Sequence, residues 1–148
     1  MQLADTHTHL YLPDFESDRK AVIFRAVDLG VNTFLLPNID RSSIRSMLEL
    51  RDLYPNYCYP MMGLHPNAVR PGFRPELKEV RKQLYKSKYY AVGEIGIDLY
   101  RGLKYQKEQV HVFRTQVELA LELNLPVVIH SRDSFDLIVK ILKEYNDP

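Results

Sequence analysis

The chain has 148 residues, of which 45% are hydrophobic and 26% are charged, as is typical of a soluble globular protein able to bury one core. Its 20 Lys and Arg residues nearly balance 19 Asp and Glu residues, and the net charge of +1 excludes global electrostatic steering towards nucleic acid or a membrane. The single cysteine, Cys58, excludes an internal disulfide. With no apolar run near the roughly 20 residues that span a bilayer, we expect a cytoplasmic protein without signal peptide or transmembrane helix.

Short apolar runs alternate with longer helical patterns along the chain, which is typical of βα units around a parallel sheet. The predicted strands are residues 3–6, 33–37, 57–63, 89–95 and 127–130. The clearest helix spans residues 106–124, where apolar residues recur at spacings of three and four. We expect left-handed residues to end the first, second and fourth helices, at Gly30, Asn56 and Asn124. The predicted N-caps of the second and fifth helices are Asp40 and Asp133.

These elements make about five βα units, whereas a closed (β/α) barrel needs eight units and about 250 residues. One copy of the chain therefore cannot close a barrel. Open flavodoxin-like sheets also contain five parallel strands at about this length, so the pattern alone leaves two α/β architectures open. In either case we expect residues 1–148 to form a single domain.

Three predicted strands lead into residues that can bind metals. His7 and His9 follow the first strand and, by side-chain alternation, point to the same side. Glu94 ends the fourth strand, where burying a lone carboxylate would be costly without a metal, and His130 ends the fifth. Each has a simpler interpretation: a surface pair of histidines, a carboxylate in solvent beside a glycine turn, and a hydrogen-bonded core histidine. Together, at the face where α/β enzymes place their sites, they favour a metal centre.

Four motifs carry a more specific signal: Asp-Thr-His-Thr-His from Asp5, Gly-Leu-His-Pro from Gly63, Gly-Glu-Ile-Gly-Ile-Asp from Gly93, and Pro-Val-Val-Ile-His-Ser-Arg-Asp from Pro126. Their order resembles that of TatD-type deoxyribonucleases over essentially the whole chain. The resemblance implies a partial TIM-type barrel that binds one or two divalent ions (Mg, Mn or Zn) and hydrolyses DNA phosphodiesters at exposed ends or single strands. It also implies that His7 and His9 bind the first ion, that Glu94 bridges both ions, and that His130 binds the second.

The resemblance places His65 at the rim in contact with the phosphate or a water molecule, although ordering the loop before Pro66 explains it equally well. The loops after the third, fourth and fifth strands are basic and aromatic, so they favour a phosphate-rich polymer. Arg132 is the best single phosphate contact, because a guanidinium matches phosphate oxygens bidentately. The other expected substrate contacts are Arg70, Tyr100 and Arg101, with Phe73 and Tyr105 as further stacking surfaces. We assign His111 to the surface, and give Tyr11 and Phe15 no role.

TatD-type proteins complete the site with a histidine and an aspartate from later strands, which have no counterpart in this sequence. We therefore expect an N-terminal portion of a barrel, completed by a C-terminal segment or by other copies in an oligomer. Two alternatives to the nuclease stay open. One is a hydrolase of small esters, amides or aminoacyl compounds on the same metals, and the other is a catalytically impaired fragment or binding module.

Overall fold

The computed structural model describes residues 2–145, so residue 1 and residues 146–148 of the expected domain lie outside the described part. The elements in chain order are β1 (Leu3–Asp5), α1 (Arg19–Asp28), β2 (Val31–Pro37), α2 (Ile44–Leu53), β3 (Cys58–Met61), α3 (Arg74–Lys86), β4 (Val92–Asp98), α4 (Gln106–Glu122), β5 (Val127–Arg132) and α5 (Phe135–Lys143). Short 3-10 helices cover Pro13–Phe15 and Pro66–Ala68. Strands and helices alternate, as the sequence pattern predicts.

The strands are parallel and follow the order of the chain. One group has the order β1-β2-β3, and the other pairs β4 with β5. Backbone hydrogen bonds join the two groups where β3 meets β4, from the Tyr90 amide to the Pro60 carbonyl at 3.0 Å and from the Met62 amide to the Ala91 carbonyl at 3.1 Å. A flavodoxin-like sheet would place the first strand between the second and third. Here β1 lies at the edge and β2 lies between β1 and β3, so the flavodoxin-like alternative is excluded.

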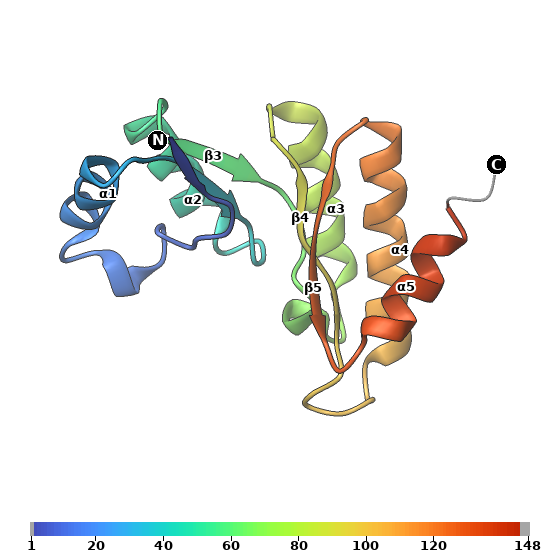
Figure 1. Ribbon diagram of the computed structural model, residues 1–148. Helices are drawn as coiled ribbons and strands as arrows, with labels where there is room; N and C mark the ends of the chain where they lie inside the picture. The colour runs from blue at the N-terminus through green and yellow to red at the C-terminus, as the bar shows by residue number, and fades with distance from the viewer. Residues whose placement is uncertain (1, 146–148) are drawn as a thin grey trace.

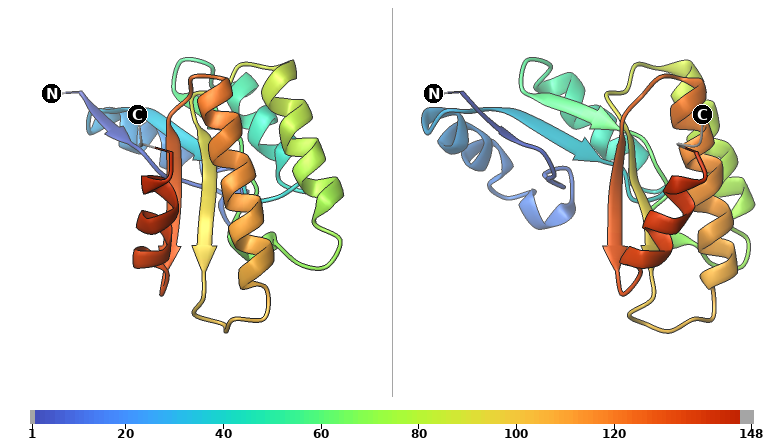
Figure 2. Two further views of the ribbon diagram at one scale, coloured as in Figure 1. Left: turned by 90° about the vertical axis from the view of Figure 1, so that its right-hand side faces the viewer. Right: turned by 45° about the vertical axis from the view of Figure 1, so that its right-hand side comes forward.

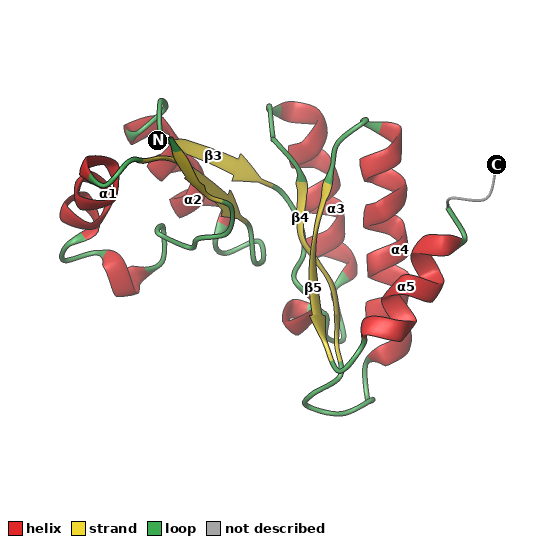
Figure 3. Ribbon diagram, in the orientation of Figure 1, coloured by secondary structure: helices red, strands yellow, loops and turns green. Residues whose placement is uncertain are grey.

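The helices pack along the strands that they connect. Figure 1 shows α3, α4 and α5 on the same side of β4 and β5, with α1 at the opposite end of the molecule. Figure 2 shows β4 and β5 running side by side in the same direction beneath α4 and α5. Figure 3 shows α1, α2 and β1 to β3 on the left, α4 and α5 on the right, and β4 and β5 between them. Because the strands within each group are parallel, the loops that follow them lie at the same edge of that group.

All five strands differ from their predicted limits by one to three residues, and the differences in β1, β4 and β5 bear on the position of the candidate ligands. β1 ends at Asp5, so His7 and His9 lie beyond it. β4 begins at Val92 and continues to Asp98, and β5 continues to Arg132. Glu94 is therefore the third residue of β4 and is only 6% exposed, which corrects both its prediction as a strand end and the alternative of a carboxylate in solvent. The strand continues because Ile95 and Ile97, which follow Glu94, are fully buried.

A close approach of the backbones explains the glycine between these two isoleucines. Gly96 has φ +148°, and a Cβ atom built there would lie 1.9 Å from the carbonyl oxygen of His130. Only glycine lets β4 and β5 pack this closely at the level of His130. The alternative of a glycine turn beside Glu94 is therefore wrong, since Gly93 and Gly96 both lie within β4.

The helix ends were predicted in part. Gly30 (φ 95°) and Asn124 (φ 51°) are left-handed and follow α1 and α4, as expected. Asn56 is not left-handed, and α2 has already ended at Leu53, with Tyr54 as its C-cap. The residues that precede α2 and α5 are Ser43 and Ser134, so Asp40 and Asp133 are not their N-caps. Asp40 instead accepts the backbone amides of Ser42 and Ser43 in the turn before α2.

The core lies between the strands and their helices, and α4 supplies much of it through Val112, Phe113 and Val117. At the two outer strands apolar side chains are less covered. Leu3 of β1 is 42% exposed, and the first three residues of β5 are only partly buried. Among residues 2–145, no helix has the length and apolar character needed to cross a membrane.

Candidate metal centre

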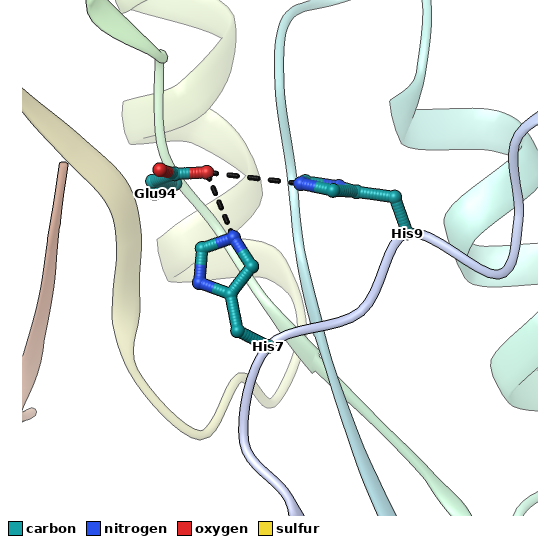
Figure 4. A group of neighbouring side chains, drawn as sticks. All are labelled: His7, His9 and Glu94. Atoms are coloured by element: carbon teal, nitrogen blue, oxygen red, sulfur yellow. Dashed lines mark ion pairs between the residues drawn. The ribbon is translucent and has the colours of Figure 1, made fainter.

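Four histidine side chains converge on the carboxylate of Glu94. Its Oε2 lies 3.0 Å from Nε2 of His7 and 3.7 Å from Nε2 of His9 (Figure 4). Its Oε1 lies 3.0 Å from Nδ1 of His130 and 3.5 Å from Nε2 of His65. The two oxygens of one carboxylate therefore face two different pairs of imidazoles.

The loop after β1 positions the first pair. The backbone amide of Thr8 donates to the carbonyl of Leu35 at 3.1 Å, which holds this loop against β2. His7 and His9 flank Thr8, and their rings lie edge to face with centroids 5.2 Å apart. Both rings reach Glu94 although neither residue belongs to a strand.

Glu94 is held in its ionised form by its neighbours. Burial by itself would raise the pKa of this carboxyl group, but the surrounding imidazoles, those of His130 and His65 above all, outweigh burial and hold its pKa well below the usual range. The hydrogen bond to Glu94 in turn raises the pKa of His130, against the opposing effect of burial, and Asp98 adds to the increase. The centre thus combines one buried negative charge with several imidazole nitrogens.

Tyr11 determines which nitrogen of His9 carries the proton. The Tyr11 hydroxyl donates its only hydrogen to the carbonyl of Pro37 at 2.5 Å. It must therefore accept the hydrogen bond from Nδ1 of His9, which lies 2.8 Å away. This leaves a lone pair on Nε2 of His9, the nitrogen that faces Glu94.

His65 has the opposite arrangement. The backbone amide of Asn67 donates to its Nδ1 at 3.0 Å, so a neutral ring carries its proton on Nε2. That Nε2 lies 3.2 Å from Nδ1 of His130 as well as 3.5 Å from Glu94. In this tautomer His65 presents a hydrogen-bond donor to the centre, not a free lone pair.

The donor atoms suit divalent ions. Ligand-type atoms of His7, His9 and Glu94 lie within 4.8 Å of one another, as do those of His65, Glu94 and His130. Imidazole nitrogens combined with a carboxylate are ligands for zinc, manganese and related ions, and a carboxylate with one oxygen towards each group is able to bridge two ions. The residues present therefore fit a metal centre with one or two ions.

Several residues that support the centre were not recognised in the sequence. Asn38, which is fully buried after β2, donates from its side chain to the carbonyl of Gly63, and its own carbonyl accepts the amide of Glu94 at 3.3 Å. Gln109 and Gln116 lie seven residues apart on α4. The side chain of Gln109 bonds to both the backbone amide and the backbone carbonyl of Asp98, and that of Gln116 does the same for Leu64. Only the spacing of the two glutamines on an otherwise apolar helix face could have indicated their common role.

The expected substrate residues lie in or next to the loops that follow β3, β4 and β5. The guanidinium of Arg132 lies 3.5 Å above the ring of Tyr100, which is itself 61% exposed. Arg101 is exposed in the same loop after β4. Arg70 lines a separate hollow before α3, together with Asp40 and Glu76. These positions leave all four side chains accessible from solvent or from a surface hollow.

Two aromatic predictions fare differently. Phe73 is only 9% exposed and packs in the core. The expectation that it stacks on bases is therefore wrong, because a buried ring has no open face to offer a base. Tyr105 is partly exposed at the start of α4. His111 is exposed on α4, as expected.

Comparison with known proteins places this chain in a family. Residues 4–148 match the family described as TatD related DNase, and the chain belongs to that family. It is 34% identical over 142 residues to the uncharacterized metal-dependent hydrolase YabD of Bacillus subtilis, covering 96% of this chain and 55% of that protein. It is 30% identical over 141 residues to the 3'-5' ssDNA/RNA exonuclease TatD of Erwinia tasmaniensis, covering 95% of this chain and 54% of that protein.

A solved structure shows the same fold. The crystal structure of YjjV, a TatD homolog from Escherichia coli, superposes with a TM-score of 0.89 at 31% identity, covering 97% of this chain and 56% of that chain. The chain thus spans about half the length of the relatives that it matches.

Proposed function

We propose that the protein is a metal-dependent hydrolase that cleaves phosphodiester bonds of DNA at single strands or exposed ends. The observation that carries this proposal is the convergence of four histidines on the two oxygens of buried Glu94. Membership of the TatD related DNase family supports it, and so does similarity to a relative named as a 3'-5' ssDNA/RNA exonuclease.

Each residue of the centre has a proposed part. His7, His9 and Glu94 would bind one divalent ion, and Glu94 and His130 would bind a second. Magnesium, manganese and zinc are all compatible with this mixture of ligands. A bound divalent ion would neutralise charge on the phosphate and lower the pKa of a water molecule that attacks phosphorus.

The remaining residues would bind and orient the substrate. His65 presents its Nε2 proton to the centre, so we assign it as a hydrogen-bond donor to a phosphate oxygen rather than as a ligand. Arg132 would contact a phosphate through its guanidinium, while Tyr100 beneath it offers a ring on which a base could stack. Arg101 and Arg70 would contact the backbone of the polymer further from the centre.

We also propose that the five βα units belong to a single domain that is part of a (β/α) barrel. The parallel strands in chain order support this, as do the relatives of nearly twice the length. The strands that close the barrel would come from sequence outside this chain or from another copy in an oligomer.

The test uses the full-length protein and a labelled single-stranded oligonucleotide in metal-controlled buffer. Glu94→Gln should lower turnover by more than about 100-fold, because it removes the carboxylate shared by both ion sites. Glu49→Gln is the matched control, since this glutamate pairs with Arg45 on the surface of α2 and should leave turnover unchanged.

Retention of wild-type turnover in Glu94→Gln would rule out the bridging role. Small esters, amides and aminoacyl esters should be assayed with the same preparation. Hydrolysis of one of these without any cleavage of DNA would show that the phosphodiester assignment is wrong.

A further inference from the structure

The second carboxylate near the centre, Asp98, contacts the far side of the His130 ring. Its Oδ2 lies 2.9 Å from Nε2 of His130, while Nδ1 of the same ring faces Glu94 at 3.0 Å. The Asp98 side chain is only 1% exposed, so water does not compete for this contact. Asp98 does not itself face the imidazoles of the first pair, and neither group of ligand-type atoms includes it.

Hydrogen bonds hold both the side chain and the backbone of Asp98 in place. Its Oδ1 accepts the backbone amide of Tyr100 at 3.1 Å. Its own backbone amide donates to Gln109 of α4 at 2.8 Å, and its carbonyl accepts from the same side chain at 3.1 Å. Because α4 fixes the backbone and Tyr100 fixes one carboxylate oxygen, the other oxygen is left to His130 alone.

We propose that Asp98 is a positioning residue that keeps a proton on Nε2 of His130 and so leaves the Nδ1 lone pair available to a divalent ion beside Glu94. A carboxylate only accepts hydrogen bonds, so Asp98 holds a hydrogen on Nε2. Nδ1 also faces a carboxylate, but an ion bound to Glu94 would take the place of a hydrogen on Nδ1 and leave the one on Nε2 with Asp98. This inference rests on the proposed function, since it concerns the ligand of the second ion.

The same contacts predict the effect of an isosteric change. In Asp98→Asn, the amide of Tyr100 still requires an acceptor, so the side-chain oxygen takes the place of Oδ1. The side-chain NH₂ group then occupies the place of Oδ2 and donates to Nε2 of His130. That reverses the tautomer, and the proton moves to Nδ1, where it blocks the ion.

The experiment measures binding and tautomer as well as activity. Zinc, which is diamagnetic, is titrated into the full-length wild-type protein and Asp98→Asn against a competing chelator. We expect the second ion to bind about 10- to 100-fold more weakly in the variant, the range typical when a partner of a metal-binding histidine is lost. In ¹⁵N-labelled, zinc-loaded protein, long-range ¹H–¹⁵N spectra should show His130 protonated on Nε2 in the wild type and on Nδ1 in Asp98→Asn.

Two controls separate this effect from misfolding and from loss of charge. Asp133→Asn removes the same charge just after β5, at an exposed residue whose φ of 53° suits asparagine, and should bind both ions like the wild type. The ion held by His7 and His9 is an internal control for folding, and its affinity should stay within about twofold in Asp98→Asn.

The outcomes distinguish this inference from the proposed function. If the wild type binds two ions and Asp98→Asn matches it in second-ion affinity and in the protonation of His130, Asp98 is not a positioning residue although the metal centre stands. If the wild-type protein binds no divalent ion, the proposed function fails and this inference fails with it.

Discussion

The hydroxyl of Tyr11 lies 2.8 Å from Nδ1 of His9 and at the same time donates to the carbonyl of Pro37 at the end of β2. Tyr11 is 2% exposed, so this hydroxyl links a proposed ligand to a strand from inside the core. The link fixes both the orientation and the tautomer of His9.

Removing that hydroxyl should weaken the first metal site. In Tyr11→Phe, Nδ1 of His9 loses its acceptor and the ring is free to change tautomer or rotate, so we expect first-ion affinity to fall by about 10-fold or more. Isothermal titration of the full-length protein measures this. Tyr59→Phe, which loses an exposed hydroxyl bonded to Asn56, should bind like the wild type. Equal affinity in both variants would argue against a role for Tyr11.

Gly96→Ala should prevent the close packing of β4 on β5. The added methyl group would lie 1.9 Å from the carbonyl oxygen of His130, and backbone atoms cannot move aside cheaply. We expect a loss of about 4 kcal/mol or more in the free energy of unfolding, or failure to fold. Gly102→Ala is the matched control because it also has a positive φ but meets nothing within 4 Å. It should cost only about 1 kcal/mol, from backbone conformation alone. Similar urea midpoints for the two variants would contradict the packing argument.

Gln116→Ala should destabilise the fold through the loop that carries His65. Gln116 is fully buried, and it holds both the amide and the carbonyl of Leu64. Its loss leaves two buried polar groups without partners, which should cost about 2 to 4 kcal/mol in urea unfolding. Gln83→Ala, which loses part-buried hydrogen bonds with Glu79 and with the Tyr89 hydroxyl, should cost less, about 1 kcal/mol. A loss no larger for Gln116→Ala would mean that water replaces its hydrogen bonds.

Cys58 makes the stability of the fold sensitive to alkaline pH. Burial raises the pKa of its thiol to about 12, whereas thiols of unfolded chains ionise near about 8.5. Between these values the unfolded chain releases a proton that the folded protein retains. The thiol therefore leaves the free energy of unfolding unchanged below about pH 8.5 and lowers it as the pH rises towards 12. Urea unfolding at several pH values should show a smaller decline in Cys58→Ala. Burial also raises the pKa of Tyr89 to about 12, so part of the alkaline decline comes from this tyrosine in both proteins. The difference between the wild type and Cys58→Ala is therefore the contribution of the thiol.

The thiol itself provides a second readout. Iodoacetamide should modify Cys58 slowly in the native protein at pH 8 and rapidly in urea, because the thiolate is the reactive form. Rapid modification of the native protein would show that Cys58 is not buried as described.

The sequence by itself determined the α/β pattern, because apolar runs and amphipathic helices of the right lengths alternate along the chain. It also identified the residues that meet at the centre. His7, His9, Glu94 and His130 follow or lie within apolar strands, and parallel strands bring such positions to one end of a sheet. The end of α4 was predictable because Asn124 tolerates a left-handed backbone.

Tertiary structure alone decided how these residues act. Whether Glu94 ends a strand or lies buried within one depends on Gly96, whose missing side chain lets β5 approach. The proton positions of His9, His65 and His130 depend on their partners, which are Tyr11, the Asn67 amide and Asp98. Two of these partners lie within two residues of their histidine, but only the folded geometry shows which nitrogen each one contacts. Local periodicity specifies which face of an element is buried, whereas hydrogen-bond direction follows from atoms that the fold brings together across the chain.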